Sequence, residues 1–307
     1  MSFLNKNVSE TQIRLKDRLW LYIFSYIILF LLIVPSLVVI PMSFSASQYL
    51  EFPPREWSLR WYENYFFAWK VENGFNDWMQ ATWTSVKVAV LTIFVATPVG
   101  TMAAYGLVNS NSRLSKILFP IFISPMMVPI ILVAIGLFYF FVQFKLVGSI
   151  FGLVLGHSLV AMPLVLIIVF SALKNYDMNQ EKVARSLGAT RFRAFREITL
   201  PQIKFSIISA SLIAFLTSFD EIIISLFVAG GDNSTITRSM FLALRDQIDP
   251  TIAAISTILI VISSGLLIII QLIGNKENKK EKNLIILELF IKNFYLAGLA
   301  KSCDMKL

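Results

Sequence analysis

The segment DMNQEKVARSLGATRFRAFREITLPQ, residues 177 to 202, decides how this chain is organised. It is charged and prone to form helices, and it separates two long apolar runs. Ordinary connections between neighbouring helices are shorter than this segment. We therefore expect that it lies in water and that a partner contacts it.

The residues of this segment predict two short helices with a turn between them. Asp177 followed by Gln180 is typical of a capping box at a helix start. Gly188 is expected to end the first helix, because only glycine adopts the left-handed conformation without steric cost. Thr190 can cap a second helix, and Pro201 suits the first turn of the long helix that follows. The two apolar faces are Val183, Ala184 and Leu187, and then Phe192, Phe195 and Ile198.

Composition places the chain in a lipid bilayer. Of its 307 residues 56% are hydrophobic and only 15% are charged, whereas soluble domains carry about 25% charged residues. The net charge of +8 does not indicate nucleic acid, because the basic residues form no face interleaved with aromatic rings. The single cysteine, Cys303, excludes an internal disulfide, and the single histidine, His157, excludes a histidine cluster. We expect neither a metal nor a cofactor.

Hydropathy predicts an all-α polytopic membrane protein with six transmembrane helices. The expected spans are 19–42, 83–108, 117–142, 148–173, 205–229 and 251–273, and prolines interrupt several of them at Pro98, Pro120, Pro125, Pro129 and Pro163. Together they make a transmembrane domain over residues 1–274, followed by a tail, 275–307, to which we assign no function. The aromatic outer segment 43–82 fits a membrane-interface belt or a docking surface for a soluble partner.

Lysine and arginine counts predict the orientation. The segments on one side hold thirteen of these residues before the tail, and those on the other side hold seven. The positive-inside rule therefore places both termini and residues 177–202 in the cytoplasm. The basic residues of that loop could also rest on phospholipid head groups.

The sequence contains no catalytic site that we can identify. A Gly-x-x-x-x-Gly-Lys-Ser/Thr phosphate loop does not occur, so the chain does not hold ATP in the usual way. A nucleophile elbow is absent too. We expect that the chain is not an enzyme and that any energy for its work comes from a partner.

The most conspicuous polar group within a span is Ser218-Phe219-Asp220-Glu221. Asp220 lies about 22 Å along a helix counted from Phe205, beyond the membrane midplane. Intramembrane carboxylates are costly and usually functional, so Ser218, Asp220 and Glu221 are candidates for a substrate pathway. The alternative is that both acids bond to neighbouring helices. For His157 we expect a packed side chain bonded to a backbone carbonyl.

The order Glu181-Lys182-Val183-Ala184-Arg185-Ser186-Leu187-Gly188, followed after nine residues by Ile198, Leu200 and Pro201, resembles the cytoplasmic signature loop of permease subunits of ATP-driven, binding-protein-dependent importers. The resemblance implies the type I ABC importer permease (MetI-like) fold in a bacterial cytoplasmic membrane. It also implies a pair of ATP-binding subunits, a second permease and an external solute-binding protein as partners. We call residues 177–202 the coupling loop. The residues expected to couple it to the ATPase are Glu181, Lys182, Ala184, Gly188, Ile198, Leu200 and Pro201.

The chain departs from the family at one place in this loop. The family usually has Glu and two alanines starting six residues before the glycine, whereas this chain has Lys182, Val183 and Ala184 there, with Glu181 one position earlier. The acidic phrase at 218–221 resembles spermidine/putrescine-type permeases, which implies a polyamine substrate. Two alternatives stay open, namely an importer for another solute such as an opine, and a stand-alone ion-coupled carrier.

Overall fold

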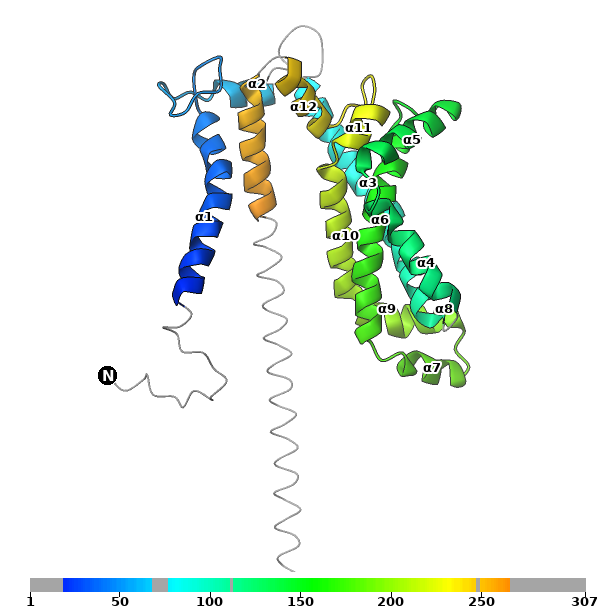
Figure 1. Cartoon of the computed structure of the whole chain (residues 1–307). Helices are drawn as coiled ribbons and strands as arrows, with labels where there is room; N and C mark the ends of the chain where they lie inside the picture. Colours follow the sequence, from blue (N-terminus) through cyan, green and yellow to red (C-terminus); the bar gives the residue numbers. More distant parts are fainter. Residues whose placement is uncertain (1–18, 68–76, 111–112, 247–248, 266–307) are drawn as a thin grey trace, which may run out of the picture. The chain divides into compact units, whose positions relative to one another are not determined.

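The computed structural model describes residues 19–67, 77–110, 113–246 and 249–265. Contacts divide the chain into two compact units, residues 1–62 with 250–307, and residues 63–249 (Figure 1). The described residues are almost entirely helical, and the only strand-like pairing among them is an isolated bridge between Ser45 and Trp57. Each unit is treated below by itself.

Three helices form the core of the unit 63–249. They are α3 (Asp77–Asn109), α6 (Ile150–Asn175) and α10 (Lys204–Phe219), and each packs against the other two. Small residues allow this close packing within a membrane. A Cβ atom on Gly100 of α3 would lie 2.8 Å from Cγ1 of Val165 of α6, so only glycine fits there.

Prolines interrupt fewer helices than the sequence indicates. α3 runs through Pro98 and α6 runs through Pro163, so the interruption expected at these two positions is wrong. Neighbouring helices can satisfy the carbonyl groups that a membrane proline leaves free. α3 also begins at Asp77, well before the apolar run that starts at Trp83.

The third apolar run, expected as one span over 117–142, is two helices. α4 (Arg113–Ile123) continues into a short 3-10 turn, η3 (Ser124–Met126), and α5 (Ile130–Gln143) leaves it at a bend of 92°. Pro125 and Pro129 account for the bend, because proline lacks the amide proton and crowds the preceding turn. Pro120 lies inside α4 without ending it.

The fifth apolar run, expected over 205–229, is broken as well. α10 ends at Phe219 and α11 (Ile223–Val228) begins after a gap of three residues, Asp220 to Ile222, which we call the helix break. α12 (Ile236–Asp246) follows. At its other end α10 is bent by 79° from the end of the coupling loop.

The coupling loop contains the two predicted helical pieces. The first is α7 (Asn179–Ser186). The second is a continuous stretch built from α8 (Arg191–Ala194), a π-helical turn, η4 (Phe195–Thr199), and α9 (Leu200–Gln202). Pro201 lies in α9, before the bend, so the expectation that it starts the long helix α10 is wrong.

In the unit formed by residues 1–62 and 250–307, α1 (Leu19–Met42) is apolar along its whole length and none of its residues is buried. The chain leaves this helix after Met42, and the hydroxyl of the next residue, Ser43, lies 2.7 Å from that of Tyr62. The second described helix of this unit is Thr251–Gly265. α2 (Arg60–Phe67) crosses the division between the units. Residues 1–18, the end of the expected sixth span and the tail 275–307 lie outside the described residues.

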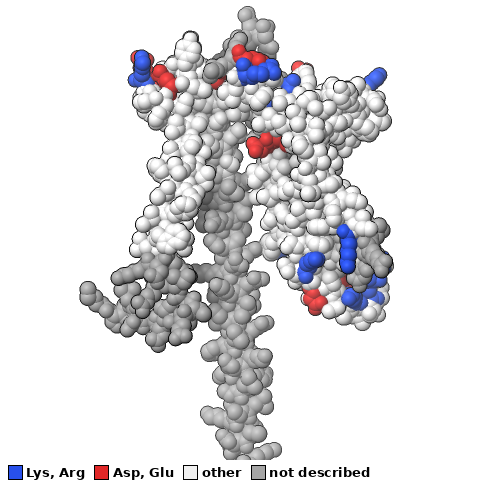
Figure 2. Space-filling view, in the orientation of Figure 1, with Lys and Arg blue, Asp and Glu red and all other residues white. Residues whose placement is uncertain are grey.

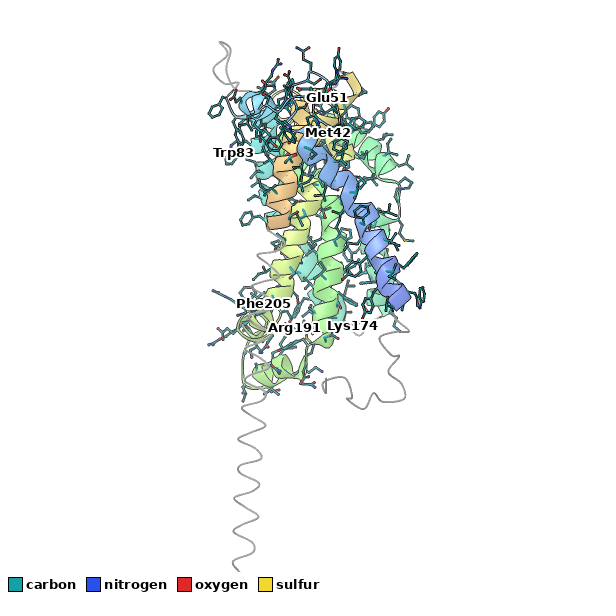
Figure 3. The ribbon with its side chains drawn as sticks, turned by 90° about the vertical axis from the view of Figure 1, so that its left-hand side faces the viewer. Met42, Glu51, Trp83, Lys174, Arg191 and Phe205 are labelled. Carbon is teal, nitrogen blue, oxygen red and sulfur yellow. The ribbon has the colours of Figure 1, made fainter. Side chains whose placement is uncertain are left out.

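Charge and length fit a membrane setting. Among the described residues, three helices are long and apolar enough to span a bilayer, or five if each bent pair counts as one span. In the unit 63–249, charged side chains gather at its two ends and few lie between them (Figure 2). Trp83 lies toward one of these ends, whereas Lys174, Arg191 and Phe205 lie at the other (Figure 3).

Candidate functional site

The turn of the coupling loop is a Schellman motif. Gly188 has a φ of +95°, its amide donates to the carbonyl of Arg185 at 3.0 Å, and the amide of Ala189 donates to the carbonyl of Ala184 at 3.1 Å. These two bonds satisfy carbonyl groups that the end of α7 leaves without partners. The expected glycine stop is confirmed at this position, and the helix axis changes direction there.

Side chains bond to the backbone near the starts of both loop helices, but the expected capping box of Asp177 and Gln180 is wrong, because Met178 is the N-cap of α7 and makes no side-chain cap bond. The carboxylate of Asp177 accepts a hydrogen bond from the amide of Asn179 at 3.0 Å, where α7 begins. The hydroxyl of Thr190 accepts from the amide of Arg193 at 3.3 Å, which confirms Thr190 as the cap of α8. Local side-chain chemistry therefore determines the shape of the loop.

Apolar side chains of the coupling loop face outward. Leu187 is 84% exposed, and Val183 and Phe192 are exposed as well. Beside them lies a hollow of about 340 Å³ between α7 and the second helical piece, lined by Ala184, Leu187, Gly188, Ala189, Arg193, Ala194, Glu197 and Ile198. Exposed apolar side chains next to a hollow, on a charged loop, are typical of a surface that a protein partner covers.

Glu181 is the exception, because it points inward. It is only 3% exposed, and its carboxylate accepts hydrogen bonds from the hydroxyls of Tyr105 at the end of α3 and Thr199 of η4, the latter at 2.6 Å. The ring of Tyr105 also packs on Phe195, with their centroids 4.6 Å apart. Glu181 thus holds α7 to the rest of the unit, and its expected part in coupling to the ATPase stays a prediction.

The other predicted coupling residues divide by exposure. Lys182, Gly188 and Pro201 are exposed, whereas Ala184, Ile198 and Leu200 are half-buried. Lys182 occupies the position where the family usually has a carboxylate, and its ammonium lies 3.4 Å from Asn179 Oδ1.

The predicted acidic group lies at the helix break, and its members do different things. Asp220 caps α10 and its side chain is exposed. Glu221 is buried, and its Oε1 accepts a hydrogen bond from the amide of Ile224 at 3.0 Å, at the start of α11. Ser218 is buried too. Of the three expected pathway residues, only Asp220 is exposed in this structure, and the pathway role of all three stays a prediction.

The side chain of His157 in α6 lies beside the helix break. Its two ring nitrogens lie within hydrogen-bond distance of the hydroxyls of Ser218 and Ser225. The expectation of a packed histidine holds, but its partners are side-chain hydroxyls and not a backbone carbonyl.

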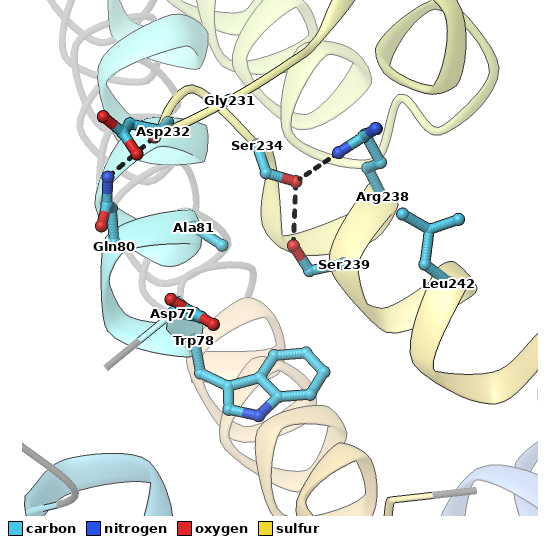
Figure 4. A pocket seen from close by; sticks show the side chains of 10 residues that line it. All are labelled: Asp77, Trp78, Gln80, Ala81, Gly231, Asp232, Ser234, Arg238, Ser239 and Leu242. Carbon is cyan, nitrogen blue, oxygen red and sulfur yellow. Dashed lines mark hydrogen bonds between the residues drawn. The ribbon is translucent and has the colours of Figure 1, made fainter. Parts of the chain in front are cut away.

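A second concave region lies at the opposite end of the unit from the coupling loop. A pocket of about 430 Å³ opens where α3 starts and α12 passes (Figure 4). The Gln80 side chain donates to the backbone carbonyl of Asp232 at 2.9 Å, and Arg238 donates to Ser234 at 3.1 Å. Trp78, Asp77 and Asp232 also line it. Its lining includes Trp78 and Arg238, two residue types that are enriched at protein interfaces.

Sequence reasoning missed the buried contacts of the coupling loop and of the helix break. Tyr105 and Thr199 hold Glu181, and Thr92 and Ser225 belong to the network around His157. Tyr105, Thr92 and Ser225 are common residues in apolar runs, and Thr199 is one polar residue of a charged loop, so no local pattern distinguishes them. The pair Gly156-His157 was the one available signal, because a glycine beside a polar residue in a span indicates a close helix approach.

These features are those of a membrane-embedded helical subunit of a transporter, and the family match agrees with them. Residues 96–278 match the family described as "Binding-protein-dependent transport system inner membrane component". The chain belongs to this family.

Similar proteins agree with this assignment over most of the chain. The spermidine/putrescine transport system permease protein PotC of Haemophilus influenzae is 28% identical over 257 residues, which cover 83% of this chain and 96% of that protein. The putrescine transport system permease protein PotI of Escherichia coli K12 is 29% identical over 236 residues, covering 75% and 81%.

A solved structure shares the fold. It is a crystal structure of a bacterial ABC transporter involved in the import of the acidic polysaccharide alginate, and one of its chains matches with a TM-score of 0.62 at 13% identity. The match covers 83% of this chain and 98% of that chain. The chain therefore has an all-helical ABC importer permease fold and is a multi-pass membrane protein, as the sequence predicts.

Proposed function

We propose that this chain is one of two permease subunits of an ATP-driven importer for polyamines such as putrescine and spermidine. A pair of ATP-binding subunits docks on the coupling loop, and an external solute-binding protein delivers the substrate. Both termini and the coupling loop are in the cytoplasm. ATP hydrolysis resides in the partners.

One observation carries the choice of substrate class. Asp220 presents an exposed carboxylate at the helix break. A carboxylate in a membrane protein marks the path of a cation or a proton, and polyamines are cations. The names of the relatives PotC and PotI point the same way.

The family favours the importer over a stand-alone carrier, and it leaves the solute open between a polyamine and an opine.

A competition experiment tests which solute is carried. The chain is expressed with its ATPase, second permease and binding protein in cells that lack other polyamine importers, and uptake of labelled putrescine is measured. We expect a large excess of unlabelled spermidine to suppress uptake and an equal excess of an opine to leave it unchanged. Absence of putrescine uptake, or suppression by the opine alone, would exclude the polyamine class.

The bonds of Glu181 lead to a stability prediction. Glu181→Leu removes the acceptor of the buried Thr199 hydroxyl and of the half-buried Tyr105 hydroxyl, and an unpaired buried group costs about 1–3 kcal/mol. We expect the purified permease in detergent to unfold at a clearly lower temperature and to retain less ATPase subunit.

The exposed neighbour Gln180 provides the matched control for this prediction. Gln180→Ala removes a side chain from the same short helix without opening the core, so its unfolding temperature stays that of the parent. Equal unfolding temperatures for Glu181→Leu and Gln180→Ala would show that the buried carboxylate does not fasten the loop.

A further inference from the structure

The two halves of the broken fifth helix are tied together by one side chain from another helix. His157 of α6 is only 1% exposed. Its Nδ1 lies 2.9 Å from Oγ of Ser218 in the last turn of α10, and its Nε2 lies 3.1 Å from Oγ of Ser225 in α11. A single imidazole ring therefore contacts both arms of the helix break.

The two serines extend this connection to the backbone of the break. The hydroxyl of Ser225 donates to the carbonyl of Glu221 at 3.1 Å, and Thr237 of α12 donates to the same carbonyl at 3.1 Å. Oγ of Ser218 also lies 3.2 Å from Oγ1 of Thr92 in α3. Backbone groups freed by a broken helix must find partners inside a membrane protein, and here one of them is satisfied through the residues around His157.

Gly156 lets the ring reach both serines. A Cβ atom at position 156 would lie 2.8 Å from Cγ2 of Ile224 in α11, closer than real contacts allow. Glycine therefore brings α6 and α11 together beside His157.

We propose that His157 is a positioning residue that braces the helix break and thereby sets where Asp220 presents its carboxylate to the substrate. Imidazole suits this task because its two nitrogens lie on different sides of a rigid ring and can bond two partners at once. The polar atoms of an amide or a carboxylate share one end of the side chain. The inference rests on the proposed role of Asp220 in the substrate pathway.

The geometry is tested by chemical labelling in the assembled importer. Asp220→Cys is combined with Cys303→Ser, and the rate of modification by a cationic methanethiosulfonate reagent is measured with and without His157→Ala. Losing two buried hydrogen bonds moves the break, so we expect the rate to change by about fivefold or more. Ser158 is the matched control, since it is the next residue, is buried, and its hydroxyl has no partner within the described part of the chain. Ser158→Ala should keep the parent rate, and an equal rate for His157→Ala overturns the brace.

Transport kinetics separate a positioning role from general damage. With Asp220 intact, His157→Ala should raise the KM for putrescine by about tenfold while the maximal rate per membrane-inserted complex changes much less. His157→Gln, which keeps a donor and an acceptor, should restore part of the KM. An equal loss in KM and maximal rate without any rescue by glutamine would contradict positioning.

A second variant tests the proposal in the case that the His157→Ala permease fails to assemble. The double variant Ser218→Ala with Ser225→Ala removes both partners and keeps the ring, and we expect the same shifts in labelling and KM. Parent-like values in both measurements would overturn the proposal. If Asp220→Asn leaves uptake unchanged but His157→Ala still alters labelling, the brace stands and the pathway role of Asp220 fails.

Discussion

Gly188→Val is expected to abolish uptake while the permease still reaches the membrane in normal amounts. Gly188 has a φ of +95°, a conformation in which a β-branched residue is strongly disfavoured. The strain breaks the Schellman turn that ends α7, so the exposed face of the loop no longer meets its partner in one geometry. Uptake of labelled putrescine by cells, normalised to permease in the membrane fraction, measures the effect.

A graded series separates backbone strain from steric collision at this position. No heavy atom lies within 4 Å of a Cβ placed on Gly188, so alanine introduces strain and no clash. The left-handed conformation costs most L-residues about 1–2 kcal/mol, and asparagine tolerates it better. We therefore expect uptake to fall in the order Gly, Asn, Ala and Val. Normal uptake by the valine variant would remove the turn from the coupling mechanism.

Asp220→Asn carries the second large effect that we expect. It removes the exposed charge at the helix break but keeps the size of the side chain. Weakening one charge interaction with a cationic substrate by about 1.4 kcal/mol raises KM about tenfold. Insertion and assembly should change little, because the side chain is exposed.

Asp220→Glu is the matched variant for this test. It keeps the charge and moves it by one methylene, so its KM should lie between that of the parent and that of asparagine. The measurement is the concentration dependence of putrescine uptake in the assembled importer. Identical kinetics for the parent and Asp220→Asn would remove Asp220 from the pathway.

The parts of the site that could be predicted from the sequence are those shaped by local chemistry. The glycine stop and the threonine cap act on their own helix ends, so Gly188 and Thr190 could be interpreted without any tertiary information. The predicted loop helices therefore agree with α7 and α8. The place of Pro201 was wrong because the bend into α10 comes after it, at Ile203.

What could not be predicted depends on contacts between distant residues. Glu181 and Tyr105 are 76 positions apart, and His157 lies 61 from Ser218 and 68 from Ser225. Because of these pairings the conspicuous side chains of Glu181 and Ser218 turn inward. The effect of the prolines could not be predicted from the local sequence either. α3 and α6 stay continuous through theirs, whereas Pro125 and Pro129 together end a helix.

The most direct test of the account asks whether an ATPase subunit covers the coupling loop. Leu187→Cys in a Cys303→Ser background places a single thiol of this chain on the most exposed apolar position of the coupling loop, directly after α7. We expect a short bifunctional reagent to join this position to the ATPase subunit, and the assembled complex to shield it from a membrane-impermeant maleimide added from the cytoplasmic side. A thiol that labels equally with and without the ATPase, or that labels from outside intact cells, would contradict the proposed coupling.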